Sequence, residues 1–99
     1  MATKDEAARY LCNVAPEQCF WVNNGPILRN VEVLANALED ISEDIYSHHA
    51  NKDKNDFSKW VNEIIGDQKL ANDLLSSKNK GSAVKKVKAR LNSLKKKAG

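Results

Sequence analysis

Short apolar runs at helical spacing, each ended by a capping or turn residue, are the feature that most constrains this chain. The clearest run follows the i, i+3, i+4, i+7, i+8 pattern and consists of Phe57, Trp60, Val61, Ile64 and Ile65. Asn55 or Asp56 can cap its start, and Gly66 can end it. A chain divided in this way can form only short helices, each of which must bury one apolar face.

The same pattern recurs along the whole sequence. Thr3 and Glu6 fit a capping box for a helix over residues 4–13, and Pro16 prevents this helix from continuing. Further helices are expected to begin at Asn30, Ser42, Asn55 or Asp56, Asp67 and Ser82. Because the chain has only four Gly and two Pro, a fold rich in strands and turns is disfavoured. The sequence therefore predicts an all-α fold, a compact bundle of about five short helices plus a basic amphipathic C-terminal helix.

The net charge of +3 hides a strong separation of charge along the chain. Residues 1–77 contain seven Lys and Arg against thirteen Asp and Glu, a net charge of −6. Residues 78–99 contain nine Lys and Arg and no acid, a net charge of +9. The sequence thus predicts an acidic helical body over 1–77 and a basic helix within 78–99, which either belongs to the same domain or extends from it as a mobile segment.

The basic helix is the strongest functional signal, because a concentrated positive field most often meets phosphate. Its candidate nucleic-acid contacts are Lys85, Lys86, Lys88, Arg90, Lys95, Lys96 and Lys97. Lys outnumbers Arg eight to one in residues 78–99, which favours non-specific contact with the backbone of DNA or RNA over base reading. If about six of these cations met phosphates on duplex DNA, log affinity would fall with log salt at a slope of about −5.

Three alternatives to nucleic acid follow from the same segment. Apolar residues at 3-4 spacing form a seam, consisting of Val84, Val87, Leu91, Leu94 and Ala98. This apolar seam could serve a protein-interaction adaptor, or it could pack on the acidic body and leave a solvated Lys-rich face. An anionic membrane surface is a further possible partner, although the sequence contains no transmembrane segment.

No arrangement of residues typical of an enzyme or a metal site is present. The sequence lacks a glycine-rich phosphate loop, a G-x-S-x-G motif and an H-E-x-x-H motif. Cys12, Cys19, His48 and His49 could supply four zinc ligands by count, but their spacings do not match those of zinc modules. We therefore expect a cytoplasmic, non-enzymatic protein without a metal or cofactor, and we expect His49 to be a packed histidine bonded to a carboxylate or carbonyl.

Part of the chain resembles an uncharacterised family of small domains that is prominent in archaea and carries a domain-of-unknown-function label. The resemblance covers residues 17–75 and rests on an F-W-x-x-x-G motif at Phe20 and an N-D-F-x-x-W motif at Asn55. It implies no reaction. It implies instead one shared cluster, either a core or a site, formed by Phe20, Trp21, Asn24, Gly25, His49, Asn51, Asn55, Asp56, Phe57 and Trp60. A small-ligand domain built on His49, Asn55 and Asp56 is the remaining functional hypothesis.

Overall fold

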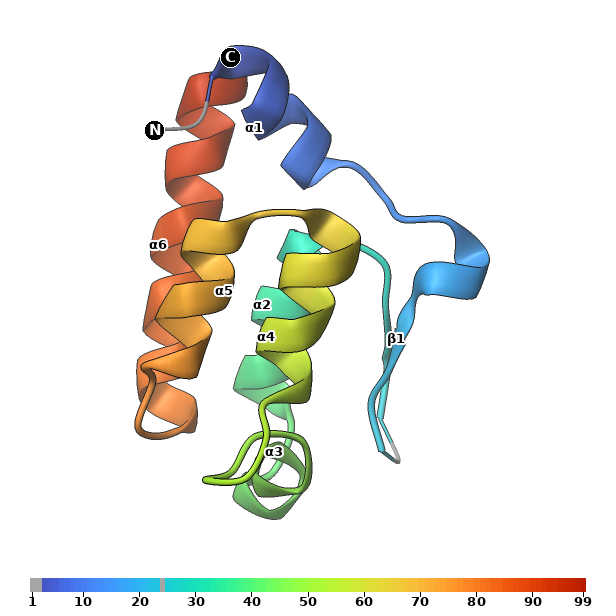
Figure 1. Cartoon of the computed structure of the whole chain (residues 1–99), viewed down its shortest axis with the longest axis vertical. Helices are drawn as coiled ribbons and strands as arrows, with labels where there is room; N and C mark the ends of the chain where they lie inside the picture. Colours follow the sequence, from blue (N-terminus) through green and yellow to red (C-terminus); the bar gives the residue numbers. More distant parts are fainter. Residues whose placement is uncertain (1–2, 24) are drawn as a thin grey trace.

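Most of the chain is helical in the computed structural model, which describes residues 3–23 and 25–99 (Figure 1). These residues form six α-helices, a 3-10 turn, a π-helical turn and two short strands. In chain order the elements are α1 (Lys4–Leu11), η1 (Pro16–Gln18), β1 (Phe20–Trp21), β2 (Ile27–Leu28), α2 (Val31–Asp40), α3 (Glu43–His49), α4 (Asp56–Trp60), η2 (Val61–Ile65), α5 (Gln68–Leu75) and α6 (Lys80–Ala98). The prediction of a compact helical fold is confirmed.

The helices begin at side chains that accept a backbone N–H of the first turn, as the sequence predicts. Thr3 and Glu6 form the capping box of α1, and Asn30 accepts the N–H of Val33 at the start of α2. The prediction for the last helix is wrong by one turn. Its cap is Asn79 rather than Ser82, because the Asn79 side chain accepts the N–H of residue 82. The helix therefore includes Gly81 in its first turn.

Two further local predictions need correction. Phe20 pairs with Leu28 and Trp21 with Ile27 in an antiparallel hairpin, so the fold is not purely all-α. The apolar run after Asn55 is not one regular α-helix, because α4 continues into the π-helical turn η2. That turn closes where Gly66, at φ 88°, donates its N–H to the carbonyl oxygen five residues earlier at 2.7 Å.

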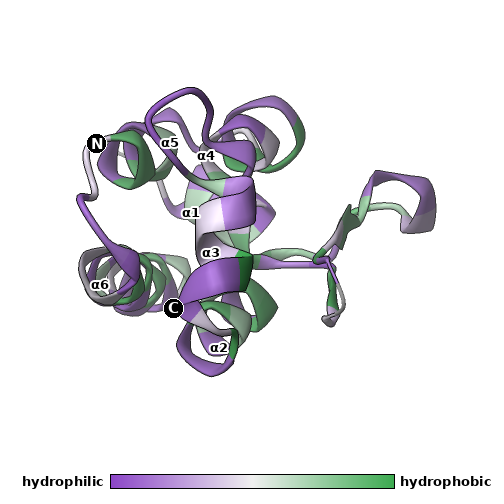
Figure 2. Ribbon diagram, turned by 90° about the horizontal axis from the view of Figure 1, so that it is seen from below, coloured by the Kyte–Doolittle hydropathy of each residue, from purple (hydrophilic) through white to green (hydrophobic). Residues whose placement is uncertain are grey.

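The core lies between α6 and the helices that surround it. α6 packs along α1, α2 and α5, and the middle of its apolar seam, at Val87, Leu91 and Leu94, is buried among them. Val84 and Ala98, at the two ends of the seam, are half-buried. The hairpin and η1 project from the side of the helical body opposite α6, as two perpendicular views show (Figures 1 and 2). No helix in the described part of the chain is both long and apolar enough to cross a membrane.

Candidate nucleic-acid interface on the C-terminal helix

Burial of the seam turns the opposite side of α6 toward solvent. Successive residues of a helix are about 100° apart, so the residues opposite the seam fall on one face. This outward face includes Lys85, Ala89, Asn92 and Lys96, all of which are exposed. α6 contains no acidic residue. The charge of this face therefore depends on which of its cations are paired with the rest of the protein.

Two cations of the segment hold the ends of neighbouring helices. The Lys80 ammonium donates to the carbonyl oxygens of Leu38 and Glu39, each at 3.2 Å, near the end of α2. The Lys86 ammonium donates to the carbonyl oxygen of Asp73 at 3.3 Å, near the end of α5. The last carbonyls of a helix carry partial negative charge, so a cation stabilises them. These lysines connect α6 to the body, and Lys86 is directed away from the outward face.

Two more lysines form ion pairs with α2 at the edge of the outward face. Lys88 bonds the carboxylate of Glu39, and the Lys95 ammonium lies 3.1 Å from the carboxylate of Glu32. The hydrogen bond and charge of Lys88 hold the pKa of Glu39 below its ordinary value. All four side chains are about half exposed or more. Exposed pairs of this kind contribute little to stability, so an incoming anion can compete for both lysines.

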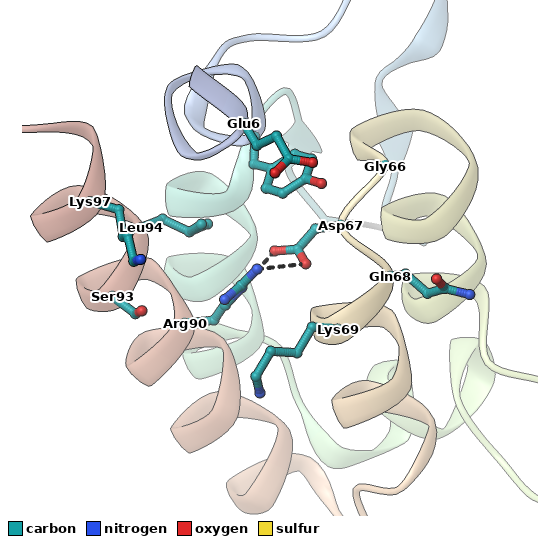
Figure 3. Close-up of a pocket in the computed structure, with 10 residues that line it drawn as sticks. Glu6, Gly66, Asp67, Gln68, Lys69, Arg90, Ser93, Leu94 and Lys97 are labelled. Carbon is teal, nitrogen blue, oxygen red and sulfur yellow. Dashed lines mark hydrogen bonds and ion pairs between the residues drawn. The ribbon is translucent and has the colours of Figure 1, made fainter. Parts of the chain in front are cut away.

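Arg90 has a different environment from the lysines. Its Nε and Nη2 atoms donate to the two carboxylate oxygens of Asp67 at 2.7 and 3.0 Å (Figure 3). Asp67 is 1% exposed and also caps α5 by accepting the N–H of Leu70 at 3.2 Å. Arg90, predicted as a nucleic-acid contact, thus holds a buried ion pair between α5 and α6. The signal that could have indicated this is its identity as the single arginine among eight lysines, because the guanidinium fork suits a buried carboxylate.

Two exposed lysines remain on the outward face. Lys85 and Lys96 form no ion pair or hydrogen bond with any described residue. Lys78 is also unpaired among the described residues, but it precedes α6 and lines a recess with the loop between α3 and α4. Lys85 and Lys96 are separated by about 16 Å along the helix axis, at 1.5 Å per residue. Of the seven predicted contacts, the structure brings Lys85 and Lys96 together on one open face and places Lys88 and Lys95 at its edge. Lys97 lies instead on the side of α6 that faces α1 and α5.

The cluster implied by the family resemblance is mostly a packed core. The Phe20 ring stacks on Phe57 at 5.1 Å between centroids and meets Trp60 edge-on at 6.1 Å. The Trp60 indole N–H donates to the carbonyl oxygen of Gln18 at 2.8 Å. These contacts attach the hairpin to α4, and they leave Trp21 71% exposed on the other face of the hairpin.

His49 is the packed histidine that the sequence predicts. Its Nε2 atom accepts the backbone N–H of Asn23 at 3.0 Å, so the proton lies on Nδ1, which donates to Asp56 at 3.0 Å. The amide of Asn55 accepts the N–H of Ser58 at 3.0 Å and donates to a carbonyl of α5 at 3.1 Å. His49, Asp56 and Asn55, the residues of the small-ligand hypothesis, are therefore engaged within the chain.

Asn51 and Gly25 are two further members of the cluster. Asn51 is exposed and donates to the carbonyl oxygen of Ser47 at 2.9 Å. A Cβ atom on Gly25 would approach a Val22 methyl group to 2.8 Å, which explains a glycine at that position. Asn24 lies outside the described residues.

The candidate zinc ligands are not gathered at one place. Cys12 is exposed and Cys19 is half-buried, and both are free thiols. Across residues 3–23 and 25–99, no group of three or more His, Cys, Asp or Glu side chains could hold a metal ion.

A cleft between α1, the start of α5 and the end of α6 was not foreseen from the sequence. Its volume is about 390 Å³, and the Arg90–Asp67 pair forms part of its wall (Figure 3). No protein-family model, curated protein or solved structure matches this chain.

Proposed function

We propose that this protein is a non-enzymatic binding module that contacts the phosphate backbone of nucleic acid through the outward face of α6. Lys85 and Lys96 would make the primary contacts, and Lys88 and Lys95 would join them at the edge. The observation that carries the proposal is a solvent-facing helix side with unpaired lysines and no acid, on a helix whose other side is buried. Such a surface suits the regular negative charge of a phosphate backbone.

Four lysines are the largest set that this face can offer, because Lys80, Lys86 and Arg90 are bonded to the body and Lys97 lies on another side of α6. Release of Lys88 and Lys95 from Glu39 and Glu32 would cost little, since exposed ion pairs contribute about 0–1 kcal/mol. Contact through two to four phosphates gives weaker and less salt-sensitive binding than the whole +9 segment would suggest.

The chemistry of this face favours non-specific binding. Lysine is a point charge that contacts phosphate without reading bases, and α6 has no aromatic side chain on which an unpaired base could stack. The hairpin, which carries the exposed Trp21, lies across the body from α6 (Figure 1). One short ligand on the outward face would not reach it.

The alternative of a protein-interaction adaptor rests on the apolar seam, and the middle of this seam is buried. The middle of the apolar seam is covered by α1, α2 and α5, so a partner protein would have to displace these helices to reach it. We therefore favour the electrostatic interaction over an apolar one for this helix.

A binding assay with charge-matched variants tests the proposal. We expect the full chain to bind a fluorescent 20-base-pair duplex at about 50 mM salt, where phosphate contacts are strong. The double variant K85Q/K96Q should lower the affinity at least about fivefold. The control R29Q/K59Q removes the same charge from two exposed positions near the hairpin, since Arg29 follows β2 and Lys59 shares a recess with Phe20. Equal losses in both variants, or no binding by the wild type, would refute the proposal.

A further inference from the structure

The cleft beside Arg90 has a row of hydrogen-bond donors along one wall. Arg90, Ser93 and Lys97 follow one another at i, i+3 and i+7 on α6, so they line the same side of the helix. In Figure 3 the three side chains lie next to one another, with Asp67 across from Arg90 and Lys69 of α5 below. This wall is distinct from the outward face, because adjacent helix positions such as 96 and 97 point about 100° apart.

The donors of this wall are not all used within the protein. A guanidinium has five N–H groups, and Arg90 gives two of them to Asp67. The other three form no hydrogen bond with any described residue, although the side chain is only 11% exposed. Lys97 and the Ser93 hydroxyl likewise have no partner among the described residues. Of the three side chains, Arg90 is the donor held away from bulk water, and a donor in that position gains most from an acceptor that enters the cleft.

The opposite wall of the cleft carries a carboxylate, which accepts hydrogen bonds. Glu6 of α1 lines it, and the backbone N–H of Thr3 lowers the pKa of the Glu6 carboxyl, so this side chain is ionised near neutral pH. The phenol of Tyr10 lies beside it in the same wall. An anion would be repelled here, whereas a hydroxyl group of a ligand could donate to the carboxylate. The two walls together fit a molecule with an oxyanion at one end and hydroxyl groups at the other.

We propose that this cleft binds a small phosphomonoester, with its phosphate on Arg90, Ser93 and Lys97 and its hydroxyl-bearing part toward Glu6 and Tyr10. A phosphate offers three acceptor oxygens to these three side chains, and the free edge of an arginine fork suits it particularly well. The volume of about 390 Å³ lies within the range of small-ligand sites. The site is independent of the proposed contact of nucleic acid with the outward face of α6.

Titration of the full chain with inorganic phosphate and then with ribose 5-phosphate, followed by NMR, tests this inference. We expect saturable shifts of the Arg90 Nε–H signal and of the amides near Ser93, and tighter binding of ribose 5-phosphate than of inorganic phosphate. K97Q and S93A should each weaken binding, K97Q by at least about fivefold. K96Q is the matched control, because it removes the same charge from the adjacent residue and should change the affinity less than about twofold.

Three outcomes would overturn the inference. One is that neither inorganic phosphate nor ribose 5-phosphate gives saturable NMR shifts. Another is that K96Q and K97Q lose the same affinity for ribose 5-phosphate. The third is that the K97Q substitution weakens binding of a duplex with 5′-hydroxyl ends as much as it weakens binding of ribose 5-phosphate, which would assign the cleft to backbone phosphates. Thermal unfolding of each variant checks that the fold is retained, and all three substitutions lie at exposed positions.

Discussion

Substitution of Arg90 by leucine should be the most destabilising change that this structure predicts for a charged residue. In R90L the Asp67 carboxylate, 1% exposed, loses the guanidinium that donates to both of its oxygens. Removal of one partner from a buried ion pair costs about 3–5 kcal/mol, because an uncompensated charge stays in the core. That is a large part of the roughly 5–15 kcal/mol that stabilises a typical domain. For a domain of this size it corresponds to a fall in Tm of roughly 12–40 °C.

Urea unfolding, followed by tryptophan fluorescence, measures this effect, since Trp60 is buried in the core. The matched control is K88L, which breaks the exposed pair with Glu39 and should cost less than about 1 kcal/mol. In R90L/D67N the neutral amide can still cap α5, so this double variant should recover about 1–3 kcal/mol relative to R90L. If R90L were as stable as K88L, or if the double variant were no more stable than R90L, the account of the buried pair would be wrong.

Three further predictions concern single positions. G66A should lower the free energy of unfolding by about 1–2 kcal/mol in urea titration, because Gly66 has a φ of 88° that alanine adopts only with strain. N55A should cost about 1–2 kcal/mol, and N55D should cost less because aspartate can replace the cap of α4 but not the hydrogen bond to the carbonyl of Leu74. Burial raises the pKa of Asp56, but the hydrogen bonds from His49 and Lys54 outweigh it and hold that pKa below its ordinary 3.8. The wild type should therefore be more stable than D56N at neutral pH, and this difference should shrink as the pH falls from about 4 through the lower pKa of the folded state.

The helices of this protein could be predicted because each has a local signal. Thr3, Asn30 and Ser42 accept N–H groups three residues ahead, which depends on nothing distant in the sequence. The π-helical turn η2 could not be predicted, because the five apolar residues of the run from Phe57 to Ile65 fit the period of an α-helix and that of a π-helix equally well. The hairpin was missed because its strands have two residues each, too few to show alternation.

The partners of the basic helix could not be predicted in the same way. The sequence determines the number of cations in residues 78–99, but the groups they meet are distant in the chain. Lys80 bonds carbonyl oxygens about forty positions away, and Arg90 bonds Asp67 across twenty-three positions. Such contacts depend on how α6 packs on the body. Tertiary structure therefore reduces seven predicted contacts to a smaller open set, and it places two of the seven, Arg90 and Lys97, with Ser93 in the wall of a cleft.

The salt dependence of duplex binding tests the central claim most directly. With two to four lysines of the outward face on phosphates, log affinity should fall with log salt at a slope of about −2 to −3.5 for the wild type. K85Q/K96Q should reduce the magnitude of that slope by about 2, and R29Q/K59Q should leave it unchanged. A wild-type slope near zero, or the same slope in K85Q/K96Q as in the wild type, would contradict the assignment of the outward face of α6 to nucleic acid.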